Sequence, residues 1–234
     1  MNASPSDAVK PVVWKPTSEE MMKALLMVLT DKSTTTDCLF WHGSPTNSRL
    51  QNWMASVAIA DFCGASGTKN IIVNGLTATE CRAKNLCYKG REYFLEALSA
   101  RNIAREQVII APGTYHTAAE SEALLVMMKE HGWKSVTIVS QPHHQLRCFL
   151  QIIASMKKLG IYVKAYNWTS WVVDWSESLE KPLLGGGSMD GTLVDQVQGE
   201  HDRIVHYADP TDTGYSLNAT IPEMFEYLKT REQM

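Results

Sequence analysis

The chain has 234 residues, of which 44% are hydrophobic and 20% are charged, and its formal net charge is −3. These values are typical of a globular protein, and a slightly acidic chain gives no electrostatic reason to expect nucleic acid as a partner. The sequence has neither an apolar run of the ~20 residues that cross a bilayer nor a secretory signal pattern, so we expect a cytoplasmic protein without a membrane partner.

An N-terminal arm is predicted for residues 1–16, which are rich in Pro, Ser and Ala. Thr17 and Glu20 have the spacing of a capping box, which predicts a helix that ends before the threonine run at 34–36. Beyond this helix, short apolar runs alternate with longer segments of helical periodicity, and residues 76–89 are expected to form a polar loop. The pattern predicts strands at 37–41, 70–73, 107–111, 135–139 and 161–166, and helices at 50–62, 91–100, 117–131 and 142–158.

Short strands that alternate with longer helices favour a parallel sheet, and strands that are almost entirely apolar indicate that both faces are covered. We therefore predict an α/β fold, Rossmann-like, with three α/β/α layers and a mainly parallel sheet of about five strands. This domain would span residues 17–167. Residues 168–234, with two further helices at 192–207 and 222–231, would form a C-terminal extension that packs on the same domain.

A first block of polar residues lies where the third predicted strand ends and a helix begins. Ligands of open parallel sheets bind outside the strand C-termini, and helix N-termini favour anions, so Thr114 and Thr117 are candidate ligand contacts. His116 and Glu120 are four residues apart and are candidates for a catalytic acid–base pair. An alternative explanation is that Thr117 is only an N-cap, with Glu120 as its capping-box partner.

A second block follows the fourth predicted strand. Arg147 is a candidate clamp for phosphate or carboxylate, and Ser140 is a candidate ligand contact at the same helix start. His143 and His144 are candidate catalytic residues because imidazole transfers protons near neutral pH. The alternative is that one of these histidines caps the helix while the other faces solvent.

The two earlier strands also end in candidate ligand-binding residues, His42 and Gly43 after the first and Asn74 and Gly75 after the second. Glycine at such a position lets the backbone approach a ligand closely. The sequence has no glycine-rich nucleotide-binding fingerprint, nucleophile elbow or zinc-protease motif. The histidines show no diagnostic metal-ligand spacing and the five cysteines form no CxxC pair, so we predict free thiols and no metal centre.

At these strand ends the chain resembles the YdcF/SanA/ElyC family of α/β proteins, over residues 37–167. The matching segments are Trp41–Gly43, Val73–Gly75, the Thr-x-x-Thr-x-x-Glu-like start at Thr114–Glu120, and the Ser/His/Arg pattern of Ser140–Arg147. The resemblance implies a Rossmann-like fold that binds S-adenosylmethionine or a related nucleotide-like ligand at the strand C-termini. The chain differs from other members in lacking their membrane helix and the usual Gly-Gly after the first strand.

Three functions remain open. The first is an enzyme, a hydrolase or transferase, in which Arg147 and the helix N-termini hold a small anionic substrate and a histidine, with Glu120, moves the proton. The second is a protein that binds or senses a metabolite without converting it. The third is a partner-binding protein that uses the tryptophans of an irregular stretch, Trp168, Trp171 and Trp175, because Trp is common in interface hot spots. Homo-oligomerisation is also left open.

Overall fold

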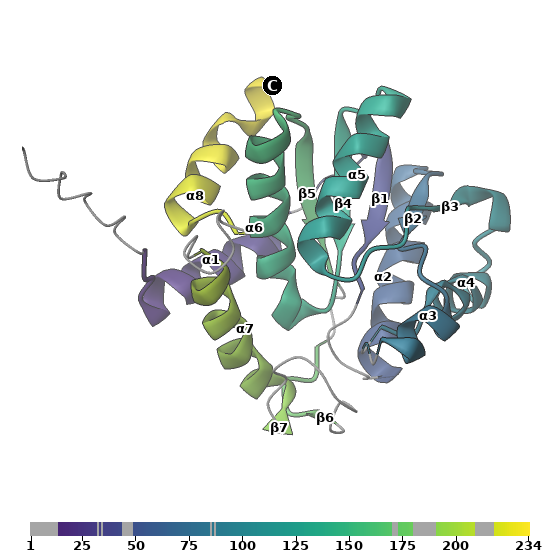
Figure 1. Cartoon of the computed structure of the whole chain (residues 1–234), viewed down its shortest axis with the longest axis horizontal. Coiled ribbons are helices and arrows are strands. Elements are labelled where there is room, and N and C mark those ends of the chain that lie inside the picture. Colours follow the sequence, from purple (N-terminus) through teal and green to yellow (C-terminus); the bar gives the residue numbers. More distant parts are fainter. Residues whose placement is uncertain are drawn as a thin grey trace, which may run out of the picture.

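A parallel β-sheet forms the centre of the protein, and helices cover both of its faces (Figure 1). The structure is a computed structural model that describes residues 14–31, 33, 35–43, 49–84, 86, 88–169, 173–179, 191–208 and 218–234. Most of the predicted N-terminal arm lies outside the described residues. Trp14, near the end of that arm, packs against the core.

Five strands form the sheet in the order β3-β2-β1-β4-β5, and every neighbouring pair is parallel. Their bounds are Cys38–Trp41 (β1), Ile71–Val73 (β2), Val108–Ile110 (β3), Ser135–Val139 (β4) and Lys164–Trp168 (β5). All residues of β1 and β2 are buried, which explains why these runs are apolar without alternation. The predicted α/β fold with a parallel sheet of five strands is thereby confirmed.

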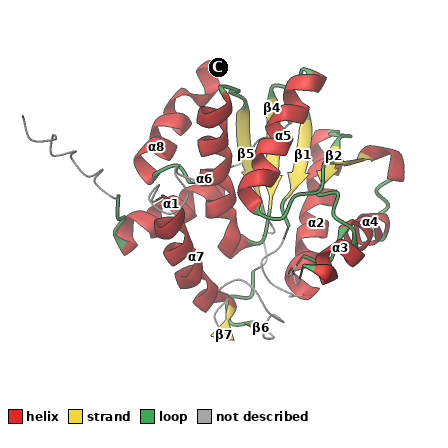
Figure 2. Ribbon diagram, viewed as in Figure 1, coloured by secondary structure: helices red, strands yellow, loops and turns green. Residues whose placement is uncertain are grey.

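The helices form two layers on opposite faces of the sheet (Figure 2). They are α1 (Ser18–Thr30), α2 (Arg49–Ser66), α3 (Ala78–Ala83), α4 (Arg91–Ser99), α5 (Thr117–His131), α6 (Pro142–Leu159), α7 (Leu193–Ala208) and α8 (Ile221–Thr230), with short 3-10 turns at Arg105–Gln107 and Arg231–Gln233. Helices α2 and α4 share one core with Trp41, whereas α1, α5, α6 and α8 share the other with Phe40. Adjacent strand residues enter different cores because successive side chains point to opposite faces.

Gly132 and Gly160 end α5 and α6 in the left-handed conformation, with φ angles of 70° and 63°, as the sequence predicts. After Gly160, the amide of Ile161 donates back to the carbonyl of Met156, so Ile161 belongs to the cap of α6. The strand predicted for residues 161–166 is therefore misplaced, and β5 begins only at Lys164.

The loop predicted for residues 76–89 is wrong for its first half, which contains α3. The side chain of Thr77 accepts a hydrogen bond from the amide of Glu80, and the Glu80 carboxylate accepts one from the amide of Thr77. This is the same capping box that starts α1. The signal was present in the sequence, but the helix is only 6 residues long and its composition is polar.

The segment after the sheet differs from the predicted irregular stretch. Trp168 belongs to β5, and its ring centroid lies 5.1 Å from that of Phe62. A small antiparallel hairpin of β6 (Ser178–Leu179) and β7 (Gly191–Thr192) leads into α7. Trp171 lies outside the described residues. Trp168 is partly buried against the core, and the predicted surface of three tryptophans stays a prediction.

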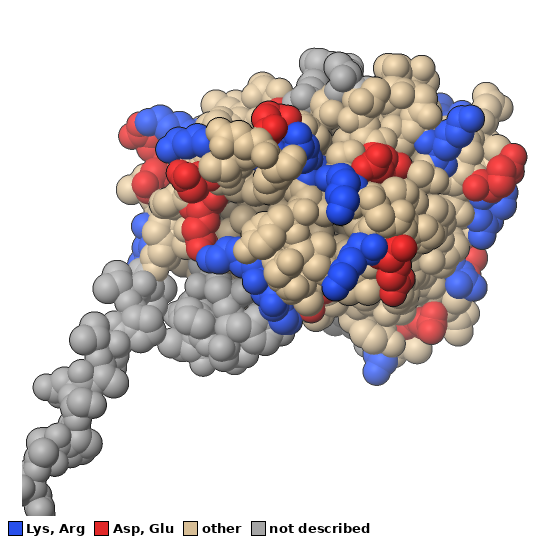
Figure 3. All heavy atoms as spheres, turned by 90° about the horizontal axis from the view of Figure 1, so that it is seen from above, with Lys and Arg blue, Asp and Glu red and all other residues tan. Residues whose placement is uncertain are grey.

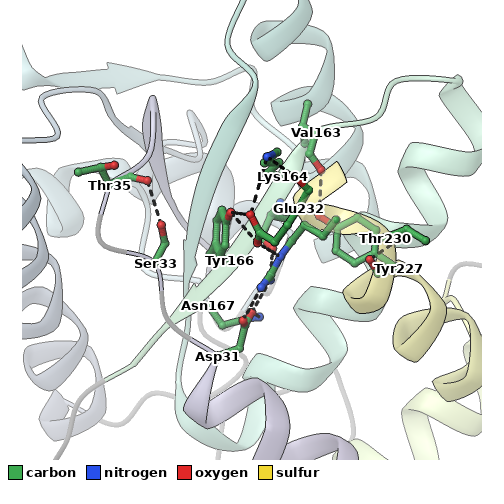
Figure 4. Close-up of polar contacts among 12 residues, drawn as sticks. Asp31, Ser33, Thr35, Val163, Lys164, Tyr166, Asn167, Tyr227, Thr230 and Glu232 are labelled. Atoms are coloured by element: carbon green, nitrogen blue, oxygen red, sulfur yellow. Dashed lines mark hydrogen bonds and ion pairs between the residues drawn. The ribbon is translucent and has the colours of Figure 1, made fainter. Parts of the chain in front are cut away.

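Side chains from the C-terminal helix cover the open edge of β5 (Figure 4). The Tyr227 hydroxyl accepts a hydrogen bond from the amide of Ala165 at 2.6 Å and donates one to the carbonyl of Val163 at 2.9 Å. Arg231 donates to the Ala165 carbonyl and, through two nitrogens, to both carboxylate oxygens of Asp31 at 2.8 Å. These contacts satisfy backbone groups of an edge strand that would otherwise be available to another strand.

Acidic and basic side chains are interspersed on the face seen from above in Figure 3, without an extended area of one sign. This fits the small net charge of the chain. Within the ranges that the structure describes, no helix is both long enough and apolar enough to cross a membrane.

Candidate functional site

The carboxyl ends of the central strands meet in one row. Trp41, the last residue of β1, pairs with Val73 at the end of β2 and with Val139 at the end of β4. Three candidate residues follow directly after these strand ends and therefore share one edge of the sheet: His42, Asn74 and Ser140. The chain order reverses between β1 and β4, and open α/β sheets bind their ligands in the crevice at such a reversal.

A buried histidine–carboxylate pair lies at this edge. The Nδ1 atom of His42 is 3.0 Å from Oε2 of Glu120, and the two side chains are 0% and 5% exposed. The other carboxylate oxygen of Glu120 accepts hydrogen bonds from the Asn74 amide group at 2.8 Å and from the Gly43 backbone at 3.4 Å. A carboxylate only accepts, so Nδ1 of His42 carries the hydrogen. The neutral ring then leaves a lone pair on Nε2, which is buried and has no hydrogen-bond partner among the described residues.

Glu120 is held in its ionised form. Burial alone would raise the pKa of the Glu120 carboxyl, but the hydrogen bond from His42, the positive charge that this ring carries when it is protonated, and the hydrogen bonds from Asn74 and Gly43 outweigh burial and lower this pKa. The carboxylate is therefore negative at neutral pH and can orient the His42 ring and stabilise a proton gained at Nε2.

Gly43 and Gly75 are required for packing within the protein. A Cβ atom on Gly43 would lie 2.8 Å from the Tyr88 ring and 3.2 Å from Oε1 of Glu120. A Cβ atom on Gly75 would lie 2.1 Å from the carbonyl oxygen of Ala111. These close approaches account for both glycines without a ligand, and their predicted role as ligand contacts stays a prediction.

Asn74 connects the end of β2 to the loop before α5. Its Nδ2 atom donates to the carbonyl of Thr114 at 2.8 Å, and its Oδ1 atom accepts from the amide of Thr114 at 3.2 Å. The side-chain amide nitrogen of Asn74 also donates to Oε1 of Glu120, so Asn74 fixes the carboxylate relative to the sheet. In this structure Asn74 and Thr114 position Glu120.

The start of α5 differs from both sequence interpretations. His116, not Thr117, is the N-cap, and its Nδ1 atom accepts a hydrogen bond from the amide of Ala119 at 3.2 Å. His116 is exposed, whereas Glu120 turns inward to His42. Neither the expected capping box of Thr117 and Glu120 nor the expected pairing of His116 with Glu120 is therefore formed. A neutral imidazole nitrogen accepts a hydrogen bond as a hydroxyl oxygen does, so His116 takes the cap position that the sequence pattern gave to Thr117.

A second buried cluster joins α6 to α7. The Nε atom of Arg147 lies 2.5 Å from Oε2 of Glu200, which also accepts a hydrogen bond from Nδ1 of His144 at 3.2 Å. Arg203 pairs with the other oxygen of Glu200. Arg147, expected to clamp an anionic ligand, thus has an internal carboxylate partner in this structure.

Sequence reasoning missed Glu200. This carboxylate lies seven residues after Leu193 and four before Ile204, both buried, and so falls in the middle of the apolar stripe of α7. A charge at such a position signals a buried partner, here Arg147. Burial alone would raise the pKa of Glu200, but the charge of Arg147 and the contact with His144 hold it well below the usual value.

His144 belongs to the second cluster and is buried. Burial, and then the positive charge of Arg147, lower the pKa of His144. His143, one residue earlier, lies elsewhere. It lines a pocket between α1, α6 and α7, is 2% exposed, and has no hydrogen-bond partner at either ring nitrogen among the described residues. The four predicted catalytic residues are therefore not gathered into one site.

The described residues contain no group of three or more His, Cys, Asp or Glu arranged to hold a metal ion. Their four cysteines, Cys38, Cys63, Cys81 and Cys148, are free thiols. Comparison of the chain with protein-family models, curated proteins and solved structures finds no significant match. The resemblance to the YdcF/SanA/ElyC proteins therefore rests on the strand-end motifs alone and stays a prediction.

Proposed function

We propose that the chain is an enzyme that binds a small anionic or nucleotide-like ligand, such as S-adenosylmethionine or a phosphorylated metabolite, after β1 and β4. The chemistry is a hydrolase or transferase reaction, and His42 moves the proton. The observation that supports this proposal best is the buried pair of His42 and Glu120, in which Nδ1 is bound and Nε2 has no partner. A carboxylate that fixes the ring through one nitrogen leaves the other to act as a general base.

The start of α6 supplies a second argument, for the anion. Gln141, the N-cap, makes no side-chain hydrogen bond to the first turn of its own helix, and Pro142 occupies the first helical position. Pro142 has no amide hydrogen and the amide of His144 donates to the carbonyl of Gln141, so the first turn offers an anion at most the amide of His143, at an end of the helix that its dipole makes favourable for negative charge. In this assignment the start of α6 takes the role that the sequence suggested for Arg147, which Glu200 already pairs.

The test begins with a thermal-shift screen of S-adenosylmethionine, adenosine phosphates, glucose 6-phosphate and inorganic phosphate. A compound at 100 times its dissociation constant adds about 2.7 kcal/mol of stability, or roughly 5–11 °C in melting temperature for a chain of this size. Compounds that bind are then incubated with the protein, and products are identified by mass spectrometry.

The His42→Asn variant identifies the site. It should lower turnover of a converted compound about 10²–10⁴-fold, the usual contribution of a general base. The matched control is His131→Asn, at an exposed ring that stacks on Trp133 far along α5. Equal turnover in the two variants would contradict the proposed role of His42 as the general base.

The complete burial of His42 favours a second candidate function, a protein that binds such a ligand without converting it. In that case the same compounds raise the melting temperature, and the bound compound is recovered unchanged after long incubation. The two functions therefore share the binding measurement and differ only in the product measurement.

A further inference from the structure

A pocket of about 100 Å³ lies between α1, α6 and α7, on the side of α6 where these three helices pack together (Figure 1). Its walls are apolar and buried, and they come from all three helices: Met21, Leu25, Leu146 and Ile204. Exposed side chains of Met22 and Gln198 lie at its mouth. Neither His42 nor Glu120 lines this pocket, so it is distinct from the site proposed above.

Two histidines line the pocket with ring nitrogens that have no partner. Both nitrogens of His143, a side chain that is 2% exposed, and the buried Nε2 atom of His201 have no hydrogen bond among the described residues. Buried polar atoms are nearly always hydrogen-bonded, and leaving one unpaired is costly. Three such atoms belong to side chains that line one small pocket, which indicates a molecule that supplies the missing partners.

The hydrogen-bond network makes Nε2 of His201 a donor. The Nε2 atom of Gln198 lies 3.0 Å from a carboxylate oxygen of Asp202 and 3.1 Å from Nδ1 of His201. Because a carboxylate only accepts, the first contact fixes that Gln198 atom as the amide nitrogen, which can only donate. Nδ1 of His201 therefore accepts, and Nε2 carries the hydrogen. A proton added to Nδ1 beside Asp202, which is 3.6 Å away, would leave that hydrogen in place.

His143 presents one donor and one acceptor. Burial lowers the pKa of His143 to about 3, although the negative charge of Glu200 acts in the opposite direction, so the ring is neutral at neutral pH. A neutral imidazole has one N–H group and one nitrogen lone pair. Neither has a partner within the part of the chain that the structure describes.

The charged groups around the pocket have partners of opposite sign, so they favour neither an anion nor a cation. Glu200, which lines the pocket, contacts both Arg147 and Arg203. On α1, Glu19 pairs with Lys23. The Asp202 carboxylate is largely exposed to water and faces His201 and Gln198. The unpaired atoms belong to a neutral ring and to an N–H group, which an uncharged polar molecule can satisfy.

A hydroxyl group fits these atoms better than a carbonyl or an ether, which only accept hydrogen bonds. A hydroxyl donates one hydrogen and accepts through two lone pairs. Its oxygen can accept from Nε2 of His201 while its hydrogen points to the lone pair of His143. If His143 presents its N–H group instead, the second lone pair of the same oxygen accepts from it.

From this arrangement we propose that the pocket binds a small uncharged molecule with an apolar body and a single hydroxyl group, as in phenol. The hydroxyl lies between His143 and His201, and it pairs with two of the three unpaired nitrogen atoms. This proposal does not depend on the proposed enzyme activity, because the residues involved belong to a different pocket.

The walls favour an aromatic body of one ring. Met21 and Met22 line the pocket, and contacts between a thioether sulfur and an aromatic ring are attractive. An engineered, closed cavity of about 150 Å³ holds benzene. A pocket of about 100 Å³ that opens at Met22 and Gln198 therefore suits one ring, with part of the ring at the mouth.

The test is a titration of the ¹⁵N-labelled full chain with phenol and, separately, with toluene, in which a methyl group replaces the hydroxyl. Amide chemical shifts report binding, and we expect saturable shifts confined to α1, α6 and α7. Phenol should bind about tenfold more tightly than toluene, although toluene is the more apolar molecule, because only phenol supplies a buried hydrogen bond to the histidines.

The His143→Leu variant should reverse this preference. It replaces the unpaired ring by an apolar side chain, so phenol binding weakens about tenfold while toluene binding stays equal or becomes tighter. Toluene binding also shows that the variant is folded and that its pocket is intact.

A second variant tests the donor on α7. His201→Ala should weaken phenol binding more than toluene binding, because it removes a hydrogen bond that only phenol makes. The matched control is His206→Ala, the same change on α7 at a residue that does not line the pocket, and it should leave the binding of both compounds unchanged.

Several results would overturn the proposal. If phenol causes no saturable shifts, water alone pairs with the two histidines. If toluene binds the parent chain as tightly as phenol, the pocket does not recognise a hydroxyl group. The same preference for phenol in His143→Leu, or equal weakening of phenol binding by His201→Ala and His206→Ala, would show that the hydroxyl does not lie between the two histidines.

Discussion

Glu120, in the first turn of α5, lies 3.0 Å from the ring of His42, which directly follows β1 and is 78 residues earlier in the sequence. The sheet order explains the encounter. Strand β1 is central, with β2 and β4 on either side. His42, the residue after β1, therefore lies where the first turn of α5 can contact it. The pair depends on tertiary structure. In the sequence alone, His42 has the pattern of an ordinary residue after a strand, and Glu120 that of a capping residue in the first turn of a helix.

Replacing Glu120 by Gln should destabilise the protein by about 2–3 kcal/mol. A carboxamide has one acceptor oxygen, so it can accept from His42 or from Asn74 but presents a donor to the other, and a buried hydrogen bond to a charged group is lost. Urea unfolding measures the change. The control is Glu122→Gln, two residues later in α5, which removes a partly exposed ion pair with Lys158 and should cost less than about 1 kcal/mol. A loss at Glu120 no larger than that at Glu122 would show that the buried pair is not formed.

Gly75→Ala and Gly64→Ala should change stability in opposite directions. A Cβ on Gly75 would overlap the Ala111 carbonyl oxygen at 2.1 Å, so the backbone must move and we expect a loss of about 2 kcal/mol or more. Gly64 lies in α2 with open space at its Cβ, and alanine should stabilise that helix by up to about 1 kcal/mol. Changes in the free energy of unfolding that had the same sign in the two variants would contradict the packing of Gly75.

Acid should destabilise the protein through His143. Burial lowers the pKa of His143 to about 3, below the ~6.5 of an unfolded chain. Between these values the unfolded state binds the additional proton, so stability is complete above pH ~6.5 and falls by about 1.4 kcal/mol per pH unit as pH decreases toward 3. His143→Leu should remove this contribution. Unfolding curves from pH 4.5 to 7 measure both slopes, and parallel slopes would mean that His143 titrates normally.

Asp31→Asn should destabilise the protein by about 1–3 kcal/mol, because it leaves the charge of buried Arg231 without its bidentate partner. Hydrogen exchange should also accelerate at the amide of Ala165, which the same C-terminal segment covers. The comparison is Glu226→Gln, which breaks an exposed pair with Lys229 and should stay within about 0.5 kcal/mol of the parent. If the exchange rate at the Ala165 amide did not change, the ion pair of Asp31 and Arg231 would not be needed to hold the C-terminal segment against the edge of β5.

The fold could be predicted because its signals are local. Apolar runs, glycine stops at Gly132 and Gly160, and the capping box at Thr17 each depend on a few neighbouring residues. The misplaced start of β5 also has a local cause, since Ile161 is apolar like a strand residue but is used by the helix cap. Apolarity alone does not distinguish a cap residue from the first residue of a strand.

The partners within the site could not be predicted in the same way. His42, Glu120, His144 and Arg147 were recognised as polar residues at strand ends, but nothing local showed that Glu120 turns to His42 and away from His116. Glu200 belongs to a helix whose position depends on packing against α6, and so the pairing of Arg147 became visible only in three dimensions. Sequence position indicates the edge of the sheet, whereas tertiary structure decides the pairs.

The most direct measurement is the tautomer of His42 in the neutral ring, obtained from long-range ¹H–¹⁵N NMR correlations of the full chain. The structure predicts a hydrogen on Nδ1, bound to Glu120, and an unprotonated Nε2 that can accept a proton from a substrate. A neutral His42 ring that carries its hydrogen on Nε2 would contradict the hydrogen bond to Glu120 and, with it, the role of His42 as a base.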